Sequence, residues 1–441
     1  MGSVGVVSLI GGSLLVLIVA GMIAQKNLPP PKPKIVGIDL GTTYSCIAAL
    51  HAVTGEIEVF RDEQGHLTFP SVVAVTEDAV LFGHDAMAQL KTNPEFTYYD
   101  AKRFIGKKFC ALEPEDTEGR YQFHIENDDG QPAFALPPEN PLHTRFMTPE
   151  MVGSVVMERL VSLARSKLKF DITKVVVSVP AKFSESQRNA TQKAAELAGL
   201  EVLRIIQEPT AAAMAYGLHK LSNPSMVLVV DLGGGTLDVS LLRVDGGMFM
   251  TLATAGNNRL GGQDFNERLL AYVQRKAVEK YGCSVSDPHY LQQMHFAVEK
   301  AKLTVTAEEW AVMQVLVPVC DHSQAAGSEV MTLNISRNLF EKLNDDLFQK
   351  VLEPIKAVLM DVEVAAEEVS DIVLVGGSTR IPKIRQIVSD YFGGKKLNLE
   401  VDPDLAVVHG AATQAGIISG MWPLKVSAVE IPYDKGNMED C

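Results

Sequence analysis

The strongest constraint on the fold is a short sequence pattern that occurs twice, about one domain length apart. The two stretches read VGIDLGTTYS over residues 36–45 and VVDLGGGTLDVS over residues 229–240. In each, an apolar run ends in aspartate, and a turn with glycine and threonine leads to a second β-favouring run. This predicts a strand, a tight turn and a strand. Such turns bring backbone N–H groups close to an anion, so two of them facing each other would hold one phosphate chain from both sides.

These turns are not the common nucleotide-binding loops. No Gly-x-x-x-x-Gly-Lys-Ser/Thr sequence occurs in the chain, and neither stretch matches the dinucleotide fingerprint. A single glycine-rich turn after a strand most often forms a simple hairpin. Two acid-bearing copies instead favour a duplicated ribonuclease-H-like fold, the actin-like ATPase architecture. We therefore expect an α/β protein with two lobes around a central nucleotide cleft.

Composition agrees with a folded protein of more than one domain. The chain has 441 residues, of which 46% are apolar and 21% charged, values that are ordinary for globular proteins. Its formal net charge of −14 argues against nucleic acid or an anionic membrane surface as a main partner. Nucleotide binding is not excluded, because it depends on local glycine turns, lysine and Mg²⁺.

Residues 1–27 form a hydrophobic segment unlike the rest of the chain. Val4–Ala24 carries no charge and is long enough to span a bilayer or to act as a secretion signal. A cleaved signal and a retained membrane anchor both stay open, since Val19-Ala20-Gly21 could serve as a cleavage site. A buried core helix fits poorly before the Pro-rich spacer 28–33. We expect the body of the protein in the lumen of the endoplasmic reticulum or microsomes.

Cysteines and glycosylation triplets add two smaller expectations. The five cysteines are scattered, with no Cys-x-x-Cys pair and no Cys/His cluster, which argues against zinc or dithiol chemistry. Asn189-Ala190-Thr191 and Asn334-Ile335-Ser336 are Asn-x-Ser/Thr triplets, which can accept N-linked glycans in a lumenal protein. Such triplets are also frequent by chance, so both alternatives stay open for each.

Hydrophobic periodicity predicts alternating strands and helices in both halves of the chain. Lobes are expected at 34–222 and 223–420, followed by a polar tail at 421–441. The expected strands are 34–39, 45–51, 56–61, 71–76, 174–179, 201–206, 226–231, 236–243, 248–254, 310–317 and 369–375; the expected helices are 84–91, 148–168, 184–198, one that opens at Glu208, 264–280, 288–303, 336–358 and 404–418, with a surface hairpin within 111–145.

The candidate site residues gather around the glycine turns. Phosphoryl transfer to water needs a metal, a cationic clamp, an oriented nucleophile and N–H donors. Asp39 and Asp231 stand where strands end, so they could hold Mg²⁺ and its waters. A third strand-to-glycine turn, Gly376-Gly377, could lie against a nucleoside. Hydroxyls and close-approaching turn amides for phosphate oxygens would come from Gly41, Thr42, Thr43, Gly233, Gly234, Gly235 and Thr236.

At these residues the chain resembles the nucleotide-binding domain of the seventy-kilodalton heat-shock chaperone family. The matching stretches occur in order and cover about 34–420, and the hydrophobic start and short tail are most similar to the microsomal branch that consists of the ATPase core. The stretches are GIDLGTTYS, YDAKRFIG, VVVSVPAKF, IIQEPTAAAMAYGL, VVDLGGGTLDVS, LGGQDFN, IVLVGGSTRIPKI and DPDLAVVHGAA.

The resemblance implies a role for each matching residue. Lys102 matches the catalytic lysine on the γ-phosphate, and Glu208 matches the glutamate at the metal site. From local sequence alone, Lys102 would be predicted to be a solvated surface lysine, and Glu208 an acid in the first turn of a helix. Asp231 would help to orient the attacking water, and Thr236 would meet the terminal phosphate. The implied metal ligands are Asp39, Asp231 and Asp238; the implied nucleotide contacts are Gly41, Thr42, Thr43, Tyr44, Gly233, Gly234, Gly235, Glu299, Lys302, Gly376, Gly377, Ser378, Arg380 and Asp404; the cofactors are ATP or ADP with Mg²⁺, with K⁺ as a further candidate.

The chain departs from the family pattern at several positions. Leu303 stands where the family usually has an arginine stacked on adenine, which leaves that side of the base without a cation. Gln207 replaces an asparagine before Glu208, and Gln263 and Asn257 replace acids nearby. None of these changes removes the lysine, glutamate and aspartates of the expected reaction, so we expect hydrolysis to survive.

The expected function is that of a slow, Mg²⁺-dependent ATPase in protein processing and quality control. The sequence given leaves no room for the family's peptide-binding domain, so client binding is not carried over. By resemblance the partners are J-domain or nucleotide-exchange proteins, and we expect a monomer that contacts the membrane only through an uncleaved N-terminal segment. The main alternative is a nucleotide-gated interaction module with negligible turnover. A sugar kinase or a filament protein fits the motifs poorly.

Overall fold

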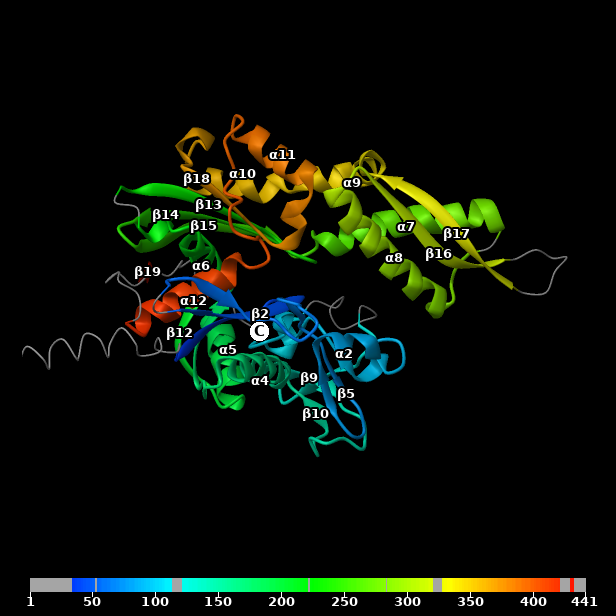
Figure 1. The fold of residues 1–441 in the computed structure, drawn as a ribbon, viewed down its shortest axis with the longest axis horizontal. Helices are drawn as coiled ribbons and strands as arrows, with labels where there is room; N and C mark the ends of the chain where they lie inside the picture. The colour runs from blue at the N-terminus through cyan, green and yellow to red at the C-terminus, as the bar shows by residue number, and fades with distance from the viewer. Residues whose placement is uncertain are drawn as a thin grey trace, which may run out of the picture.

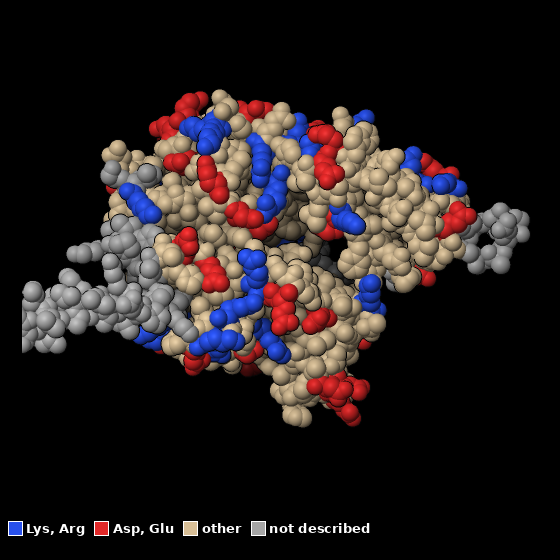
Figure 2. All heavy atoms as spheres, viewed as in Figure 1, with Lys and Arg blue, Asp and Glu red and all other residues tan. Residues whose placement is uncertain are grey.

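A computed structural model describes residues 34–51, 54–112, 121–220, 223–282, 284–319, 327–420 and 429–431. The predicted signal or anchor segment, the Pro-rich spacer and most of the predicted tail lie outside these residues. Two lobes, each built on one large mixed sheet, face each other across a central hollow (Figure 1; Figure 2). Charged side chains of both signs lie along the edges of that hollow in Figure 2.

The sheet of the first lobe has the strand order β12-β11-β1-β2-β3, with β4 paired to β2. β1 runs parallel to β11 and antiparallel to β2. The strands of this sheet are nearly continuous apolar runs, because helices cover both faces of the sheet. The bounds are β1 (Ile35–Asp39), β2 (Tyr44–Leu50), β3 (Ile57–Val59), β4 (Phe69–Pro70), β11 (Lys174–Val179) and β12 (Glu201–Gln207), and the small sheets of this lobe contain β5 (Val73–Val75), β6 (Val80–Phe82), β7 (Thr97–Tyr98), β8 (Ile125–Asp128), β9 (Gln131–Ala135) and β10 (Phe146–Met147).

The sheet of the second lobe repeats this pairing pattern. Its order is β18-β13-β14-β15-β19, with β13 parallel to β18 and antiparallel to β14. Thus β13 and β14 correspond to β1 and β2, and β18 corresponds to β11. The internal duplication is therefore structural as well as sequential. The bounds are β13 (Ser225–Leu232), β14 (Leu237–Asp245), β15 (Met248–Asn257), β18 (Asp371–Val375) and β19 (Val429–Ile431), and a separate hairpin contains β16 (Trp310–Val319) and β17 (Gly327–Ser336).

Local sequence accounts for the helix boundaries. The Thr148 hydroxyl accepts a hydrogen bond from the Met151 amide, with Pro149 as the first residue of α4, and Ser184 forms a capping box with Gln187 at the start of α5. The helices are α2 (Gly83–Gln89), α4 (Pro149–Leu168), α5 (Glu185–Leu197), α6 (Glu208–Ala215), α7 (Gly262–Tyr281), α8 (Pro288–Ala307), α9 (Arg337–Lys350), α10 (Leu352–Asp361), α11 (Pro382–Tyr391) and α12 (Ala406–Ile418), and short 3₁₀ turns include η2 (Ala101–Arg103), η4 (Leu218–Lys220) and η6 (Gly377–Arg380).

Two helices rich in small residues join the lobes. α12 follows the second lobe in sequence, but it packs on β1, β2 and β11 of the first and crosses α6 at close range (Figure 1). A Cβ on Gly410 would overlap the carbonyl oxygen of Ala211. The crossing therefore depends on a hydrogen atom at position 410, since any side chain there would push the helices apart.

The structure corrects the predicted elements in several places. The single helix expected over 336–358 is two helices, α9 and α10, which meet at Val351 just before Pro354, a residue without an N–H group. Other elements were missed. They are β17, whose ladder partner is β16; α11, which is short; β19, which is part of the expected tail but pairs with β15; and the short strands β4, β6, β7 and β10.

Candidate functional site

The two glycine turns approach each other from opposite lobes. In the β1–β2 hairpin Asp39 pairs with Cys46, and in the β13–β14 hairpin Asp231 pairs with Asp238. The turn between β13 and β14 closes when the Gly233 amide donates to the Thr236 carbonyl, at 3.0 Å. A Cβ on Gly234 would lie only 3.0 Å from the Thr43 hydroxyl oxygen. The turns are therefore in near contact, as their repeated sequence predicted.

Arg103 connects the lobes beside these turns. It lies in η2 of the first lobe, and its guanidinium donates to the carbonyl oxygens of Gly235, at 3.4 Å, and Asn258, at 3.3 Å. The Asp100 carboxylate accepts from the same guanidinium at 3.1 Å. The sequence assigned no role to Arg103, because a contact across the cleft leaves no local signal.

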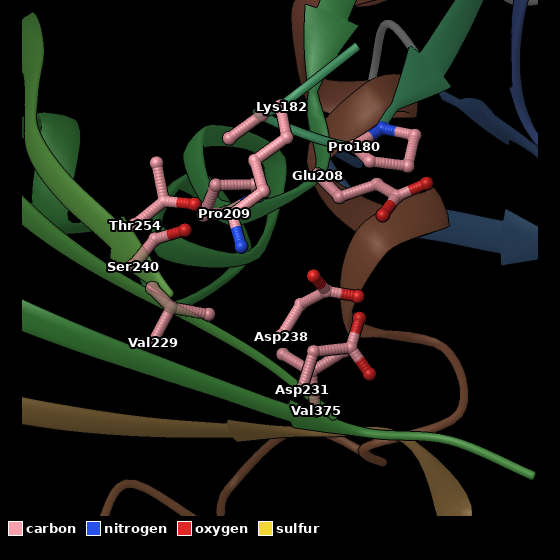
Figure 3. Close-up of a pocket in the computed structure, with 11 residues that line it drawn as sticks. Pro180, Lys182, Glu208, Pro209, Val229, Asp231, Asp238, Ser240, Thr254 and Val375 are labelled. Carbon is pink, nitrogen blue, oxygen red and sulfur yellow. The ribbon is translucent and has the colours of Figure 1, made fainter. Parts of the chain in front are cut away.

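A pocket lies between the lobes, below the turns. It has about 350 Å³ of empty space, including its open side. Strands of the second lobe's large sheet line it on one side, and the loop after β11 and the start of α6 line it from the first lobe. In Figure 3 the carboxylates of Asp231 and Asp238 lie side by side, with Glu208 across from them and the amine of Lys182 directed toward the same space. Three of the predicted site acids thus share one pocket. Its lining is Pro180, Ala181, Lys182, Glu208, Pro209, Val229, Asp231, Asp238, Ser240, Thr254 and Val375.

Lys102 and Glu208 form a buried ion pair at this pocket. The Lys102 amine donates to the Glu208 carboxylate at 2.5 Å, and the two side chains are only 8% and 14% exposed. Burial by itself lowers the pKa of Lys102, but the nearby carboxylates of Glu208, Asp39 and Asp231 outweigh it, and the pKa is raised. Lys102 is therefore a fixed positive charge among several acids, and not the solvated surface lysine that its local sequence suggests.

The three aspartates are crowded and poorly solvated. Burial, with Glu208 as a further cause, raises the pKa of Asp39 to about 6, although the Ser178 hydroxyl donates to its carboxylate at 2.7 Å. The same two causes raise the pKa of Asp238 to about 6. Burial and the neighbouring Glu208 raise the pKa of Asp231 well above its usual value. Such a cluster is unstable in its ionised form unless positive charge is added.

The donor set fits a hydrated, oxygen-preferring cation. The acids gathered here are carboxylates, the ligand type that Mg²⁺ prefers. Burial, and then the neighbouring Glu208, raises the pKa values of Asp39, Asp231 and Asp238, so a nearby cation would favour their ionised forms. In the described part of the chain, however, no three His, Cys, Asp or Glu side chains are close enough to bind a metal directly. Such a cation would keep several waters or phosphate oxygens as ligands, as Mg²⁺ commonly does.

The third glycine turn closes the site from the second lobe. Gly376, after β18, has a φ of 82°, and a Cβ there would overlap the Leu232 carbonyl next to Asp231. The Ser378 hydroxyl donates to the Gly233 carbonyl at 2.8 Å. These contacts hold the loop after β18 against the glycine turn between β13 and β14. The structure thus brings together two stretches that lie far apart in the sequence.

Comparison with known proteins agrees with this architecture. A model of the Hsp70 protein family matches residues 35–431. The chain belongs to the Hsp70 family. Similar proteins include Heat shock 70 kDa protein 13 of Bos taurus, 46% identical over 97% of this chain and 98% of that protein. The same protein of Homo sapiens is 45% identical over 96% and 97%, and a heat shock protein of Pyricularia oryzae is 41% identical over 87% and 61%.

Membership of the Hsp70 family confirms the predicted fold. The family's ATPase domain is an actin-like, duplicated ribonuclease-H-like unit, and its members are ATPases that use ATP or ADP with Mg²⁺. The chain is therefore an Hsp70-type nucleotide-binding domain. None of the helices among the described residues is long and apolar enough to cross a membrane.

The expected nucleoside contacts of the Hsp70 site lie around the outer part of the cleft. Arg380 pairs with Asp402 and with Asp404, at 2.9 Å for the latter, and a Cβ on Gly377 would lie 2.8 Å from the Asp404 carboxylate. Lys302, on α8, donates to Glu299 at 2.8 Å. These side chains are already held by partners, so a nucleoside would meet an ordered surface.

Of two residues expected at the mouth of the cleft, Leu303 departs from the family pattern and Tyr44 keeps it. Leu303, on α8, is 59% exposed, so the position of the family's stacking arginine carries an apolar side chain in contact with solvent. Tyr44, from the first lobe, has a pKa raised by burial and then by the carboxylates of Glu299 and Asp404. Its hydroxyl therefore lies within electrostatic range of the second lobe, across the cleft. Gly41 and Thr42 lie beside it in the β1–β2 turn.

Glu430 is a residue near the site that sequence reasoning missed. It belongs to β19, and its side chain is 13% exposed. Its carboxylate accepts a hydrogen bond at 2.8 Å from the backbone N–H of Gln207, the residue immediately before Glu208. Burial raises the pKa of Glu430. The expectation of a polar tail gave no signal for this contact, because it forms only when β19 joins the sheet edge at β15.

Proposed function

We propose that this Hsp70 domain binds ATP with Mg²⁺ between its two glycine turns and hydrolyses it slowly in the lumen of the endoplasmic reticulum. The observation that carries the proposal is the ion pair of Lys102 and Glu208, placed among the buried carboxylates of Asp39, Asp231 and Asp238. A cation and several acids at the junction of two glycine turns are the groups that phosphoryl transfer requires.

In the proposed reaction, some residues would neutralise charge and others would position the phosphates and the attacking water. Turn amides in 41–43 and 233–236 would donate to phosphate oxygens, because their glycines allow close approach. The Lys102 amine would neutralise charge that develops on the γ-phosphate, and the carboxylate of Asp231 would accept a hydrogen bond from the attacking water and orient it. Held through waters by Asp39 and Asp231, Mg²⁺ would supply charge neutralisation of the β- and γ-phosphate oxygens.

A single-turnover experiment tests this proposal. ATP is bound to the full chain with Mg²⁺, and the formation of ADP is followed in the wild type and in Asp231→Asn. We expect the variant to bind ATP and to hydrolyse it at least about tenfold more slowly, because it loses a charged acceptor for the attacking water. Equal rates in the two proteins would reject the enzyme and would favour the nucleotide-gated interaction module.

Low pH is expected to weaken the binding of Mg²⁺ and nucleotide. Asp39 and Asp238 have pKa values of about 6 in the folded protein, above their usual value of 3.8. They are ionised above pH 6 and become protonated as the pH falls through 6, and a protonated carboxyl no longer attracts a cation. Calorimetric affinities for Mg²⁺-ADP should therefore fall between about pH 7.5 and about pH 5. An unchanged affinity would show that these carboxylates do not contact the metal.

The ligand-free protein should show the opposite trend in stability. A carboxyl whose pKa is raised on folding binds more protons in the folded state, so its destabilising effect is complete above pH 6 and decreases as the pH falls from 6 toward 3.8. Asp238→Asn removes one such group. Its stabilising effect on the free energy of unfolding should therefore be larger at about pH 7.5 than at about pH 5, measured by denaturant titration.

Leu303→Arg is expected to tighten the binding of purine nucleotides. The exposed Leu303 would be replaced by a guanidinium that can stack on adenine, a contact worth about 1 kcal/mol, or about fivefold in affinity. Leu303→Met is the matched control, since it keeps an apolar side chain without adding charge. Binding of ADP and of CDP should be compared, and a gain equal for both nucleotides would mean that the guanidinium acts through charge and not through stacking.

We further propose the cellular setting and partners. The uncharged segment at 4–24 supports entry into the secretory pathway, and the family supports J-domain and nucleotide-exchange proteins as partners of a monomer. Pull-down from lumenal extract with ATP, with ADP and without nucleotide tests the partners. Partners should change with the nucleotide in the wild type, and capture that is identical in all three conditions would contradict nucleotide-gated association.

A further inference from the structure

The β16–β17 hairpin presents an apolar face to solvent. Because side chains alternate between the two faces of a strand, Met313 and Met331 lie in the core of the second lobe, while the other face is open. On that open face Trp310 is 63% exposed, Val312 is 71% exposed and Val330 is 59% exposed. The hairpin lies at one end of the second lobe, away from the cleft (Figure 1).

This outward face contains no charged residue. The side chains that β16 and β17 direct outward are all apolar or uncharged polar. In the described part of the face, no charged side chain therefore opposes contact with another apolar surface. An exposed apolar surface of this kind needs a cover, or it favours association. The outward residues are Trp310, Val312, Gln314, Leu316 and Pro318 on β16, and Ser328, Val330, Thr332, Asn334 and Ser336 on β17.

Asn334 lies within this apolar face. Its direct cross-strand neighbour is Val312, and the next pair on the same face of the ladder is Trp310 with Ser336. The Asn334 side chain is exposed, whereas Ile335 points into the core. The triplet Asn334-Ile335-Ser336 is thus displayed with its acceptor amide toward solvent and beside the most exposed apolar side chains of the hairpin.

We propose that Asn334 carries an N-linked glycan that covers this face. The proposal rests on the lumenal location proposed above, because the sugar donor is a lipid-diphosphate oligosaccharide of that compartment. The Asn334 amide nitrogen bonds to the first carbon of the oligosaccharide and loses one proton. The bond between that carbon and the diphosphate oxygen breaks, and the lipid diphosphate leaves with the electron pair.

The other triplet of the chain provides an internal comparison. Asn189 is exposed on α5, but its helix surface also exposes Glu185 and Lys193, which are charged. A glycan at Asn189 would have no uncharged apolar face to cover. The structure therefore distinguishes two triplets that are equivalent in sequence: only at Asn334 does a glycan also remove a surface that would otherwise favour association.

The first test is translation of the full chain with endoplasmic reticulum microsomes. Protection from added protease reports the location, and a gel-mobility step removed by endoglycosidase reports the glycan. We expect Asn334→Gln to lose one step and Ser336→Thr, which keeps the triplet, to retain it. Asn189→Gln should keep the Asn334 step. A protected chain whose pattern is unchanged in Asn334→Gln overturns the glycan alone, whereas an unprotected chain overturns the lumenal location and the glycan with it.

A second readout tests whether the glycan covers the apolar face. Endoglycosidase treatment of the purified, folded protein should increase the fluorescence of a dye that binds apolar surfaces. The increase should be clearly smaller in Trp310→Thr/Val312→Thr, in which the two most exposed apolar side chains beside Asn334 are replaced by polar ones, while circular dichroism verifies that the fold is kept. Equal dye binding before and after treatment would contradict the covering role.

Discussion

Lys102→Ala is expected to leave ATP bound while it lowers the rate of hydrolysis by at least about a hundredfold, equivalent to about 3 kcal/mol of transition-state stabilisation. The Lys102 amine is buried and lies 2.5 Å from Glu208. It is the cation that would neutralise charge on the γ-phosphate, and its loss also leaves Glu208 among other buried acids without a counter-charge. Glycine turns and nucleoside contacts, which are unchanged, would maintain binding.

The measurement is single-turnover hydrolysis of bound ATP, with ATP affinity determined separately by calorimetry. Lys182→Ala is the matched control, because Lys182 lines the same pocket from the first lobe but makes no ion pair with Glu208. Its rate should fall much less. An unchanged rate of hydrolysis in Lys102→Ala would contradict a catalytic role for Lys102. If the variant instead bound ATP weakly but hydrolysed the bound ATP at the wild-type rate, Lys102 would be a binding residue.

Gly410→Ala is expected to lower the free energy of unfolding by about 3 kcal/mol, the upper part of the range for overpacking a close contact. The added methyl group would overlap the Ala211 carbonyl at the crossing of α6 and α12. This backbone cannot move away without shifting Glu208, which opens α6. We therefore expect slower ATP hydrolysis as well as lower stability, although position 410 does not line the pocket.

Chemical denaturation of the two proteins measures this effect, with Gly153→Ala as the matched control. Gly153 also lies within a helix, α4, but a Cβ there would meet only side chains, the nearest being Ala194 at 3.3 Å. That variant should be near neutral, because alanine's higher helix propensity offsets the tight contact. Equal stabilities of the Gly410 and Gly153 variants would contradict a crossing held by close backbone approach.

Much of the fold could be predicted because its signals are local. The two hairpins appear as repeated Asp-Leu-Gly sequences. The helices α4 and α5 begin one residue after their predicted starts at 148 and 184, where Thr148 and Ser184 are the N-caps. Two of the elements that were missed depend on pairing with another strand. β17 needs β16, and β19 needs the edge of β15, so their short sequences carried too little information by themselves.

The site divides in the same way. Residue types at the glycine turns suggested the aspartates as candidates. The family resemblance implied roles for Lys102 and Glu208, which local sequence alone would assign to the surface and to a helix start. Ser178, which donates to Asp39, and Arg103, which bridges the lobes, could not be predicted, because their roles exist only after the sheets have assembled. Tertiary contact, and not composition or periodicity, gives these residues their roles.

The most direct test of the account is a crystal structure of the protein with Mg²⁺ and a non-hydrolysable ATP analogue. The account predicts the triphosphate between residues 41–43 and 233–236, with the γ-phosphate next to Lys102 and the metal held near Asp39 and Asp231 through water. A nucleotide bound elsewhere, or one whose phosphates contact a single lobe and leave Lys102 paired with Glu208 away from them, would contradict it.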